Sequence, residues 1–253
     1  MTTMRASTIA LCLSSTAAAR APTRTTFTFA VGSRRPLSIG VQEVTDRAWW
    51  AEQSEVEGSN PFGAKLWPAA LGVANHLADL PGDRLRGLQV VDCGCGNGLC
   101  SLTLAAMGAN VTATDISPVA LSLTARAAAA QSLDVATLCF DVGSTEPLPK
   151  ADLYIFADLL YDAQLARFVA NRVSEAARRG AWVIVGSHTI SGREAFLSRL
   201  DALLDPTPAF GEEQVVRSKA LKWKEKRWRR MELNVPAWAQ TTDMTTEPRS
   251  KSA

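Results

Sequence analysis

A glycine-rich turn is the first segment of this chain whose residue types and spacing can do chemistry. Residues 90–99 read Val-Val-Asp-Cys-Gly-Cys-Gly-Asn-Gly-Leu, so Gly94, Gly96 and Gly98 follow the acidic Asp92 and precede a helical stretch. Glycines at such a turn let a ligand approach the backbone closely and leave N–H groups exposed where the helix starts. The spacing is G-x-G-x-G rather than the G-x-G-x-x-G of a dinucleotide site, which disfavours an NAD-dependent oxidoreductase.

A second acidic residue, Asp115, ends the next apolar run, Val111–Thr114. In doubly wound nucleotide folds a carboxylate at this position accepts both hydroxyls of a ribose. The turn and the acid together predict a nucleoside-binding site, and a tight turn without a ligand is the alternative. Asp141 follows the run Ala136–Phe140 and is a third candidate, for which a helix N-cap or a turn residue is an equally good interpretation.

Alternating strand and helix patterns position these residues. Short apolar runs alternate with helical stretches, which is typical of βαβ units and a parallel sheet. Two strands around a basic turn in Gln214–Val235 predict an antiparallel edge. The expected class is therefore α/β, with a Rossmann-like, doubly wound, mostly parallel sheet. Expected parallel strands are Leu88–Cys93, Val111–Thr114, Ala136–Phe140, Leu153–Ala157 and Trp182–Gly186; expected helices are Val44–Val56, a helix starting at Trp67-Pro68, Leu99–Met107, Pro118–Ser132, Leu165–Arg178 and Glu194–Leu204.

Over roughly residues 60–205 these motifs resemble the class I S-adenosylmethionine-dependent methyltransferases, which have a seven-stranded sheet. The resemblance implies S-adenosyl-L-methionine as the cofactor. It implies that Asp115 holds the ribose and that Asp141 meets the adenine amine. It also implies that the methionine part is held by the acid of the first parallel strand and the glycines that follow it, namely Asp92, Gly94, Gly96 and Gly98.

Two further motifs resemble the D-x-x-Y branch of that class, which is rich in protein-lysine methyltransferases and includes the electron-transfer-flavoprotein β-subunit lysine methyltransferase. The Trp67-Pro68 pair looks like the tryptophan motif of the branch, which implies that Trp67 contacts the cofactor; a core aromatic at a helix start is the alternative. Residues 157–161 read Ala-Asp-Leu-Leu-Tyr and look like the D-x-x-Y signature. The Asn/Asp-Pro-Pro-Tyr/Phe motif of enzymes that methylate planar amino groups is absent from the sequence.

This signature makes Asp158 and Tyr161 the catalytic candidates and places Ala157 beside the cofactor. A lysine amine is neutral only about once in 2,500 molecules at pH 7, so the site must favour its deprotonation by desolvation or by passing a proton to water. A carboxylate favours the ammonium form, so we expect Asp158 to orient the amine and Tyr161 to shape the lysine channel by cation–π contact, neither acting as a general base. Helix capping by Asp158 and packing by Tyr161 are the alternatives.

The composition limits the class of partner. The 253 residues are 47% hydrophobic and 21% charged, with a net charge of +2, which excludes a wholly disordered chain and disfavours a dedicated nucleic-acid binder. No run of about 18 apolar residues is present, so no membrane partner is expected. We expect a monomer that acts on a protein presenting a lysine. Residues 219–230 carry basic residues and tryptophans that suit either stacked bases or a hairpin with inward-packed tryptophans.

No metal site is expected, because His76, His188 and the cysteines do not have the spacing of metal ligands.

Residues 1–42 contain no Asp or Glu and five arginines among many Ser, Thr and Ala residues, which is typical of a transit peptide. A disordered tail and a secretory or two-part plastid signal are the alternatives. The expected organisation is a transit peptide or disordered segment over 1–42, a methyltransferase domain over 43–240 and a disordered tail over 241–253.

The expected function is therefore a protein-lysine N-methyltransferase in an organelle, a mitochondrion or alternatively a plastid. An RNA methyltransferase, a small-molecule methyltransferase and a non-catalytic binding module with this fold stay as alternatives, because a fold alone does not establish an activity.

Overall fold

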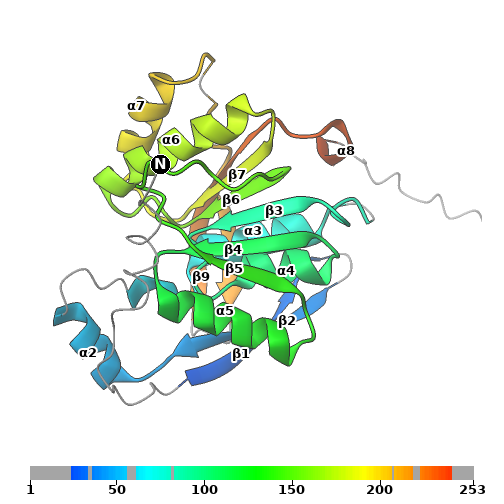
Figure 1. Cartoon of the computed structure of the whole chain (residues 1–253), viewed down its shortest axis with the longest axis vertical. Helices are drawn as coiled ribbons and strands as arrows, with labels where there is room; N and C mark the ends of the chain where they lie inside the picture. Colours follow the sequence, from blue (N-terminus) through cyan, green and yellow to red (C-terminus); the bar gives the residue numbers. More distant parts are fainter. Residues whose placement is uncertain are drawn as a thin grey trace, which may run out of the picture.

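The computed structural model describes residues 24–33, 36–55, 61–80, 83–206, 208–218 and 223–240, and within them seven strands form one sheet (Figure 1). The order across the sheet is β5-β4-β3-β6-β7-β9-β8. The first five of these are mutually parallel, and β9 pairs antiparallel with both β7 and β8. The strands are β3 (Gln89–Cys93), β4 (Asn110–Asp115), β5 (Val135–Cys139), β6 (Leu153–Ala157), β7 (Trp182–Ser187), β8 (Gln214–Ser218) and β9 (Trp223–Leu233).

Helices cover both faces of this sheet. Helices α3 (Pro68–Ala78), α4 (Leu99–Ala106) and α5 (Pro118–Ala130) share one apolar core with the sheet, and α6 (Ala163–Arg178) and α7 (Arg193–Asp201) share the other. Figure 1 shows α6 and α7 above the sheet edge and α5 below it. The described residues also include α2 (Arg47–Glu55), the 3-10 turn η1 (Pro61–Ala64) and α8 (Ala237–Gln240). The parallel sheet with an antiparallel edge confirms the predicted fold class.

Local sequence signals explain where the helices begin. Proline occupies the first turn of α3 and of α5, where its missing N–H costs nothing. Asp162 caps α6 by accepting from the backbone N–H groups of Gln164 and Leu165, both at 2.9 Å.

The strand order reverses at β3, because the chain proceeds from β3 through β4 to β5 and then returns to the other side of β3 with β6. Ligands of open α/β sheets bind in the crevice at this switch point, beyond the carboxyl ends of the strands. Residues that follow β3, β4, β5, β6 and β7 therefore meet at one edge of the sheet.

An N-terminal hairpin corrects one sequence-based boundary. The whole segment 1–42 was excluded from the fold, but β1 (Arg24–Val31) and β2 (Leu37–Val44) form an antiparallel hairpin against α4 and α5. Phe29, Val31 and Ile39 are buried in the α3–α4–α5 core, which a cleavable or disordered segment would not be. The amino-acid composition of the segment does not indicate a hairpin, because its polar residues alternate with the apolar residues that face inward. Residues 1–23 and 241–253 lie outside the described residues.

The C-terminal edge of the sheet shows how one tryptophan of residues 219–230 is packed. Trp228 on β9 is 3% exposed and packs over Gly72 of α3, where an added Cβ would lie 2.1 Å from its ring. The inward-packed hairpin is therefore confirmed at Trp228, whereas residues 219–222 lie outside the described residues. Among the helices that the structure describes, none is long and apolar enough to cross a membrane.

Candidate active site

The glycine turn after β3 adopts a backbone that requires glycine. Gly96 and Gly98 have φ angles of +55° and +83°, in the left-handed region. The N–H of Gly96 donates to Oδ2 of Asp115 at 3.0 Å, so the turn is fixed directly to the acid at the end of β4. At Gly98 an added Cβ would lie 2.5 Å from Oγ1 of Thr124 on α5, so no larger residue fits.

Asp115 is aimed into the same crevice. Its Oδ1 accepts from the N–H of Ser117 at 2.8 Å, while Oδ2 accepts from Gly96. The residue is 7% exposed, and burial raises the pKa of its carboxyl although the backbone N–H donors lower it. A carboxylate has about four acceptor positions, and those that the backbone N–H groups leave free can accept from the hydroxyls of a ribose. The geometry fits the cofactor role that the resemblance implies.

One cavity of about 180 Å³ gathers most of the predicted site residues. Its wall is built by the glycine turn, the ends of β4, β5 and β6, and the segment around η1. Eight of the ten predicted site residues line it: Trp67, Gly94, Gly96, Asp115, Asp141, Ala157, Asp158 and Tyr161.

The cavity wall does not include Asp92 and Gly98. Asp92 is 2% exposed and lies under the glycine turn, where its Oδ2 accepts from the N–H and the hydroxyl of Ser101 at 3.1 and 2.6 Å. Burial raises its pKa to about 6, against the lowering effect of both hydrogen bonds from Ser101. Gly98 is the N-cap residue of α4. Both residues thus support the turn, and their contact with the methionine part stays a prediction.

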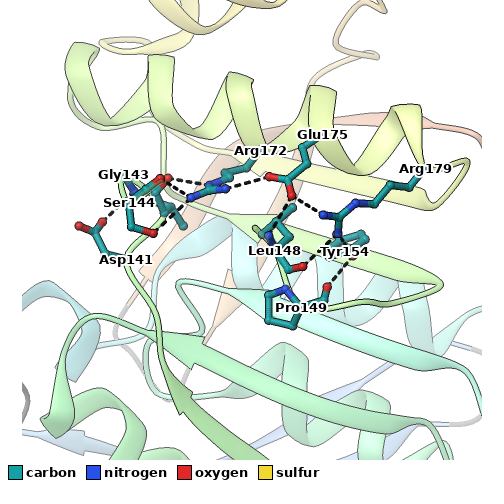
Figure 2. A network of polar contacts seen from close by, with 10 residues as sticks. Asp141, Gly143, Ser144, Leu148, Pro149, Tyr154, Arg172, Glu175 and Arg179 are labelled. Atoms are coloured by element: carbon teal, nitrogen blue, oxygen red, sulfur yellow. Dashed lines mark hydrogen bonds and ion pairs between the residues drawn. The ribbon is translucent and has the colours of Figure 1, made fainter. Parts of the chain in front are cut away.

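Asp141 stands on a loop that is fastened to α6 by a network of polar contacts (Figure 2). Its Oδ1 accepts from the N–H of Gly143 at 2.7 Å. The buried Arg172 donates from Nε to the carbonyl of Val142 at 2.9 Å and from Nη2 to the carbonyl of Ser144, and its guanidinium lies 5.2 Å from the ring centre of Phe140. Since Phe140, Asp141 and Val142 all line the cavity, Arg172 holds this wall in place from behind.

The same network continues along α6. Glu175 accepts from Arg172 at 2.8 Å and from the N–H of Leu148 at 2.9 Å. Arg179 donates to Glu175 and to the carbonyl of Leu148 at 2.5 and 3.0 Å. Figure 2 shows Arg172 and Glu175 of α6 and Arg179, the C-cap residue of this helix, pointing at the loop that joins β5 to β6. These residues are not evident as part of the site from the sequence. Opposite charges spaced three and four residues apart, as in Arg172, Glu175 and Arg179, ordinarily indicate a solvent-exposed helix face.

Aromatic side chains form the mouth of the cavity. The ring centre of Phe62 lies 6.0 Å from that of Trp67 and 5.7 Å from that of Tyr161. The indole N–H of Trp67 donates to the carbonyl of Phe62 at 2.9 Å, which fixes the orientation of the ring. Phe62 and Tyr161 are 48% and 36% exposed, so this mouth is open to solvent. Trp67 therefore lines the cavity rather than serving only as a core aromatic, and its contact with the cofactor stays a prediction.

Asp158 has a set of partners that the sequence did not indicate. Its side chain is 2% exposed, and its Oδ2 accepts from the N–H of Ala69 in the first turn of α3 at 2.6 Å. Its Oδ1 accepts from the N–H of His188 at 3.0 Å and lies 2.6 Å from Nδ1 of the same residue. Its φ of +59° is unusual for a residue other than glycine and marks a constrained position at the end of β6. The predicted contact of Asp158 with an incoming amine stays a prediction.

His188 is the residue of this site that the sequence analysis missed. It had been considered only as a metal ligand, and the groups that the structure describes contain no cluster of three His, Cys, Asp or Glu side chains suited to a metal. One signal was available: Ala157 and Gly186 are paired in adjacent parallel strands, so Asp158 and His188 both lie just past the same sheet edge.

Comparison with known proteins agrees with this geometry. Residues 90–180 match the family described as "Methyltransferase domain". The chain is 26% identical over 200 residues to the ribosomal protein L11 methyltransferase of Pseudomonas paraeruginosa, an alignment that covers 66% of each protein. The chain therefore spans about two thirds of the length of that relative.

Two solved structures illustrate the likeness in fold. The 16S rRNA N2 G1207 methyltransferase of T. thermophilus, solved with AdoMet and guanosine, superposes with a TM-score of 0.50 and 19% identity over 83% of this chain and 50% of that chain. The magnesium protoporphyrin IX methyltransferase of Synechocystis PCC 6803, solved with bound SAM, gives a TM-score of 0.45 and 22% identity over 64% of this chain and 76% of that chain.

The match of residues 90–180 to a methyltransferase domain, the strand order and the glycine turn joined to Asp115 together support an S-adenosylmethionine-dependent methyltransferase. When bound, its cofactor S-adenosyl-L-methionine supplies a methyl group on a positively charged sulfur. Within the cavity, Asp115 and the Gly96 turn would hold its ribose and the wall held by Arg172 would face its adenine, and both roles stay predictions.

Proposed function

We propose that this protein is a protein-lysine N-methyltransferase. The observation that carries the proposal is the mouth formed by Phe62, Trp67 and Tyr161, which opens on the cavity that also contains Asp115 and the buried Asp158. A lysine side chain is a long apolar stem with a cationic end, and aromatic faces stabilise both parts. The relative from Pseudomonas paraeruginosa, by its name, acts on a protein, which supports a protein acceptor for this chain as well.

The chain's own groups meet the demands of the reaction on the acceptor. The methyl group must approach the nitrogen in line, so the acceptor has to be held with few degrees of freedom, and the fixed indole of Trp67 supplies one rigid wall. Tyr161 supplies a second, partly exposed ring, which lies near Phe62. Enclosure by apolar rings also removes water from the amine and so favours its neutral form, which is the form that attacks.

An RNA acceptor is the second candidate, and the observation that favours it is the basic β8–β9 edge. The likeness to the 16S rRNA methyltransferase concerns the fold alone. Two arginines of this edge are already paired with acids: Arg217 with Glu225 at 3.2 Å and Arg227 with Glu213 at 3.1 Å. These ion pairs reduce the positive charge available for phosphates, which is why we favour a protein acceptor.

The proposal is tested by following the methyl group. The full chain is incubated with S-adenosylmethionine labelled in the methyl group and an organelle protein extract, and the labelled product is hydrolysed to amino acids. We expect the label in N-methylated lysine, resistant to nuclease and sensitive to protease. Label that is lost on nuclease treatment would show an RNA methyltransferase, and label in a small molecule would show that class instead. The variant Asp115→Ala, whose cofactor binding is weakened, serves as the low-activity control when the cofactor is kept below saturation.

We further propose an organelle as the location, a mitochondrion or alternatively a plastid, on the composition of residues 1–42. Because β1 begins at Arg24, the address itself would have to lie within residues 1–23. A fluorescent fusion of residues 1–23 should enter the organelle. A diffuse cytosolic signal would contradict this location.

A further inference from the structure

A carboxylate and an imidazole are paired beside the acceptor end of the cavity. Asp158, at the end of β6, lines the cavity, and its Oδ1 lies 2.6 Å from Nδ1 of His188, which follows β7. The backbone N–H of His188 donates to the same oxygen at 3.0 Å, so the ring and its main chain are both fixed to Asp158. The side chain of His188 is 19% exposed, against 2% for Asp158, so the imidazole is the member of the pair that reaches solvent.

The other side of the imidazole is held by the aromatic mouth. The ring centre of His188 lies 5.8 Å from that of Trp67, with an angle of 25° between the planes, which is a stacked arrangement. His188 is thus held between two residues that line the cavity, Asp158 and Trp67. A side chain held by a hydrogen bond and a stacked ring has little rotational freedom.

The pairing with Asp158 decides which ring nitrogen is available. An ionised carboxylate can only accept, so Nδ1 of His188 carries the proton and donates it to Asp158. In the neutral imidazole, Nε2 then has the free lone pair. Among the described residues no hydrogen bond to Nε2 is found; His188 does not itself line the cavity but contacts Asp158 and Trp67, which do, and its side chain is 19% exposed.

We propose that His188 is a catalytic residue that accepts a proton from the acceptor amine through Nε2, with Asp158 as its positioning residue. This inference rests on the proposed lysine specificity and extends it. The sequence analysis had assigned the amine contact to Asp158 itself, but both oxygens of that carboxylate already accept hydrogen bonds from the chain.

In the proposed proton transfer, one N–H bond of the lysine ammonium breaks and an Nε2–H bond forms on His188. This leaves a neutral amine and an imidazolium beside the Asp158 carboxylate. The freed lone pair of the amine attacks the methyl carbon, and the electron pair of the carbon–sulfur bond returns to sulfur. The imidazolium then gives its proton to water at the exposed side of His188.

Several ionisable groups lie on the elements around His188 and bear on its pH dependence. Asp158 faces Nδ1 of the ring. Cationic residues lie on three neighbouring segments: Lys65, whose amine lies 5.9 Å from the ring centre of Trp67; Arg193 of α7, which donates to the carbonyl of Thr189; and Arg229 of β9, whose backbone is paired with Ser187 of β7. On the α3 face of β7 and β9, His76, Arg230 and Glu232 form a separate ion cluster.

Two variants of His188 separate proton transfer from mere support of Trp67. His188→Asn keeps a donor near Asp158 and removes Nε2, whereas His188→Phe keeps a ring on Trp67 and removes both nitrogens. We expect both to lower turnover of methyl-lysine formation at pH 7 at least about a hundredfold, with affinity for S-adenosylhomocysteine within twofold of wild type. The deficit should shrink about tenfold per pH unit between pH 8 and 10, because the neutral fraction of free lysine rises at that rate.

The matched control is His76→Asn, which removes the only other histidine of the chain, a residue paired with Glu232 at 3.3 Å. It should leave turnover unchanged. Near-normal turnover of His188→Phe, or a deficit that is the same at all pH values, would overturn proton transfer and leave only a supporting role. Absence of methyl-lysine with the wild-type protein would instead contradict the proposed function and not this inference.

A second measurement needs no acceptor and no variant of His188. In the His76→Asn protein, His188 is the single histidine, so its ¹⁵N resonances can be assigned without ambiguity. At neutral pH we expect Nδ1 protonated and Nε2 unprotonated, with both protonated at low pH. A proton on Nε2 in the neutral ring would overturn the proposal.

Discussion

The two halves of the cavity are built in different ways. On the cofactor half, Asp115 is held by backbone N–H groups of its own strand–turn unit and of the glycine turn, so short segments of sequence determine its geometry. On the acceptor half, Asp158 is held by Ala69 and His188, which lie 89 and 30 residues away in the chain. The contacts that hold Asp115 span at most 19 residues of sequence, whereas those that hold Asp158 span 30 and 89, so only the position of Asp115 is set by neighbouring segments of the chain.

The largest expected effect concerns the hairpin that buttresses the cofactor half. A chain that begins at Val41 loses β1 and half of β2, with Phe29, Val31 and Ile39. Loss of one such side chain costs about 2–5 kcal/mol, and a domain has only about 5–15 kcal/mol of stability, so we expect this chain not to fold. The measurement is thermal unfolding followed by circular dichroism.

A chain that begins at Thr23 is the control for this truncation, because it keeps the whole hairpin. We expect it to unfold within a few degrees of the full chain. If the chain that begins at Val41 melts at the same temperature as the full chain, the hairpin is not part of the cooperative fold.

The second effect is a pH dependence of the free energy of unfolding, caused by Asp92 under the glycine turn. The pKa of Asp92 is raised to about 6 by burial, so between roughly pH 4 and 6 the folded state holds a proton that the unfolded state has released. The contribution of Asp92 to stability is therefore highest below its unfolded pKa, falls as pH rises through this window and is constant above it. A shift of about two units corresponds to about 3 kcal/mol at most.

The variant Asp92→Asn has no such titration and can still accept from Ser101. Urea unfolding at pH 4 and pH 7 should show the free energy of unfolding of the wild type falling relative to that of the variant by up to this amount. A difference that does not change with pH would mean that Asp92 is ionised in the folded protein throughout.

A third effect is confined to the acceptor half. Asp158→Asn puts an amide where three donors converge, which should cost about 1–3 kcal/mol of stability and misplace His188. We expect turnover to fall roughly a hundredfold, the loss typical of a mispositioned group, while affinity for S-adenosylhomocysteine stays within about twofold. Methyl-lysine formation and calorimetric titration are the two measurements. A turnover close to that of wild type would remove Asp158 from the acceptor site.

The fourth effect is confined to the cofactor half. Asp115→Ala removes the acceptor for two ribose hydroxyls, at about 1–3 kcal/mol, so cofactor affinity should fall roughly ten- to a hundredfold. Asp134→Ala changes an exposed acid just after α5 and should have no effect. Unchanged affinity in a folded Asp115→Ala protein would exclude this residue from the cofactor site.

The smallest effect tests the wall behind the cofactor. Arg172→Lys keeps the charge but cannot hold the carbonyls of Val142 and Ser144 together with Glu175. We expect a roughly three- to tenfold loss of affinity for S-adenosylhomocysteine, with turnover at saturating cofactor unchanged. Arg167→Lys, at an exposed position of the same helix, is the control. An equal loss in both variants would mean that α6 as a whole, and not Arg172, sets the affinity.

More of the cofactor half than of the acceptor half could be predicted from the sequence, because sequence patterns report contacts between neighbouring segments better than contacts between distant ones. The strand–turn–helix units and the role of Asp115 could be predicted because hydrophobic periodicity and glycine spacing are local signals. His188 could not be found in this way, since its meaning depends on Asp158 in the neighbouring strand. In the sequence, Arg172 has the pattern of a solvent-exposed helix residue, because its contact with the loop after β5 is visible only in the structure. The β1–β2 hairpin was hidden by an acid-free composition that resembles a targeting segment.

The most direct test of the division is a double-mutant cycle between Asp115→Ala and Asp158→Asn, read as the dissociation constant of S-adenosylhomocysteine by titration calorimetry. If the halves are independent, the double variant should bind as weakly as Asp115→Ala alone, within about twofold, and Asp158→Asn should bind like the wild type. A further tenfold loss caused by Asp158→Asn in either background would contradict the division, because it would place Asp158 in the cofactor half.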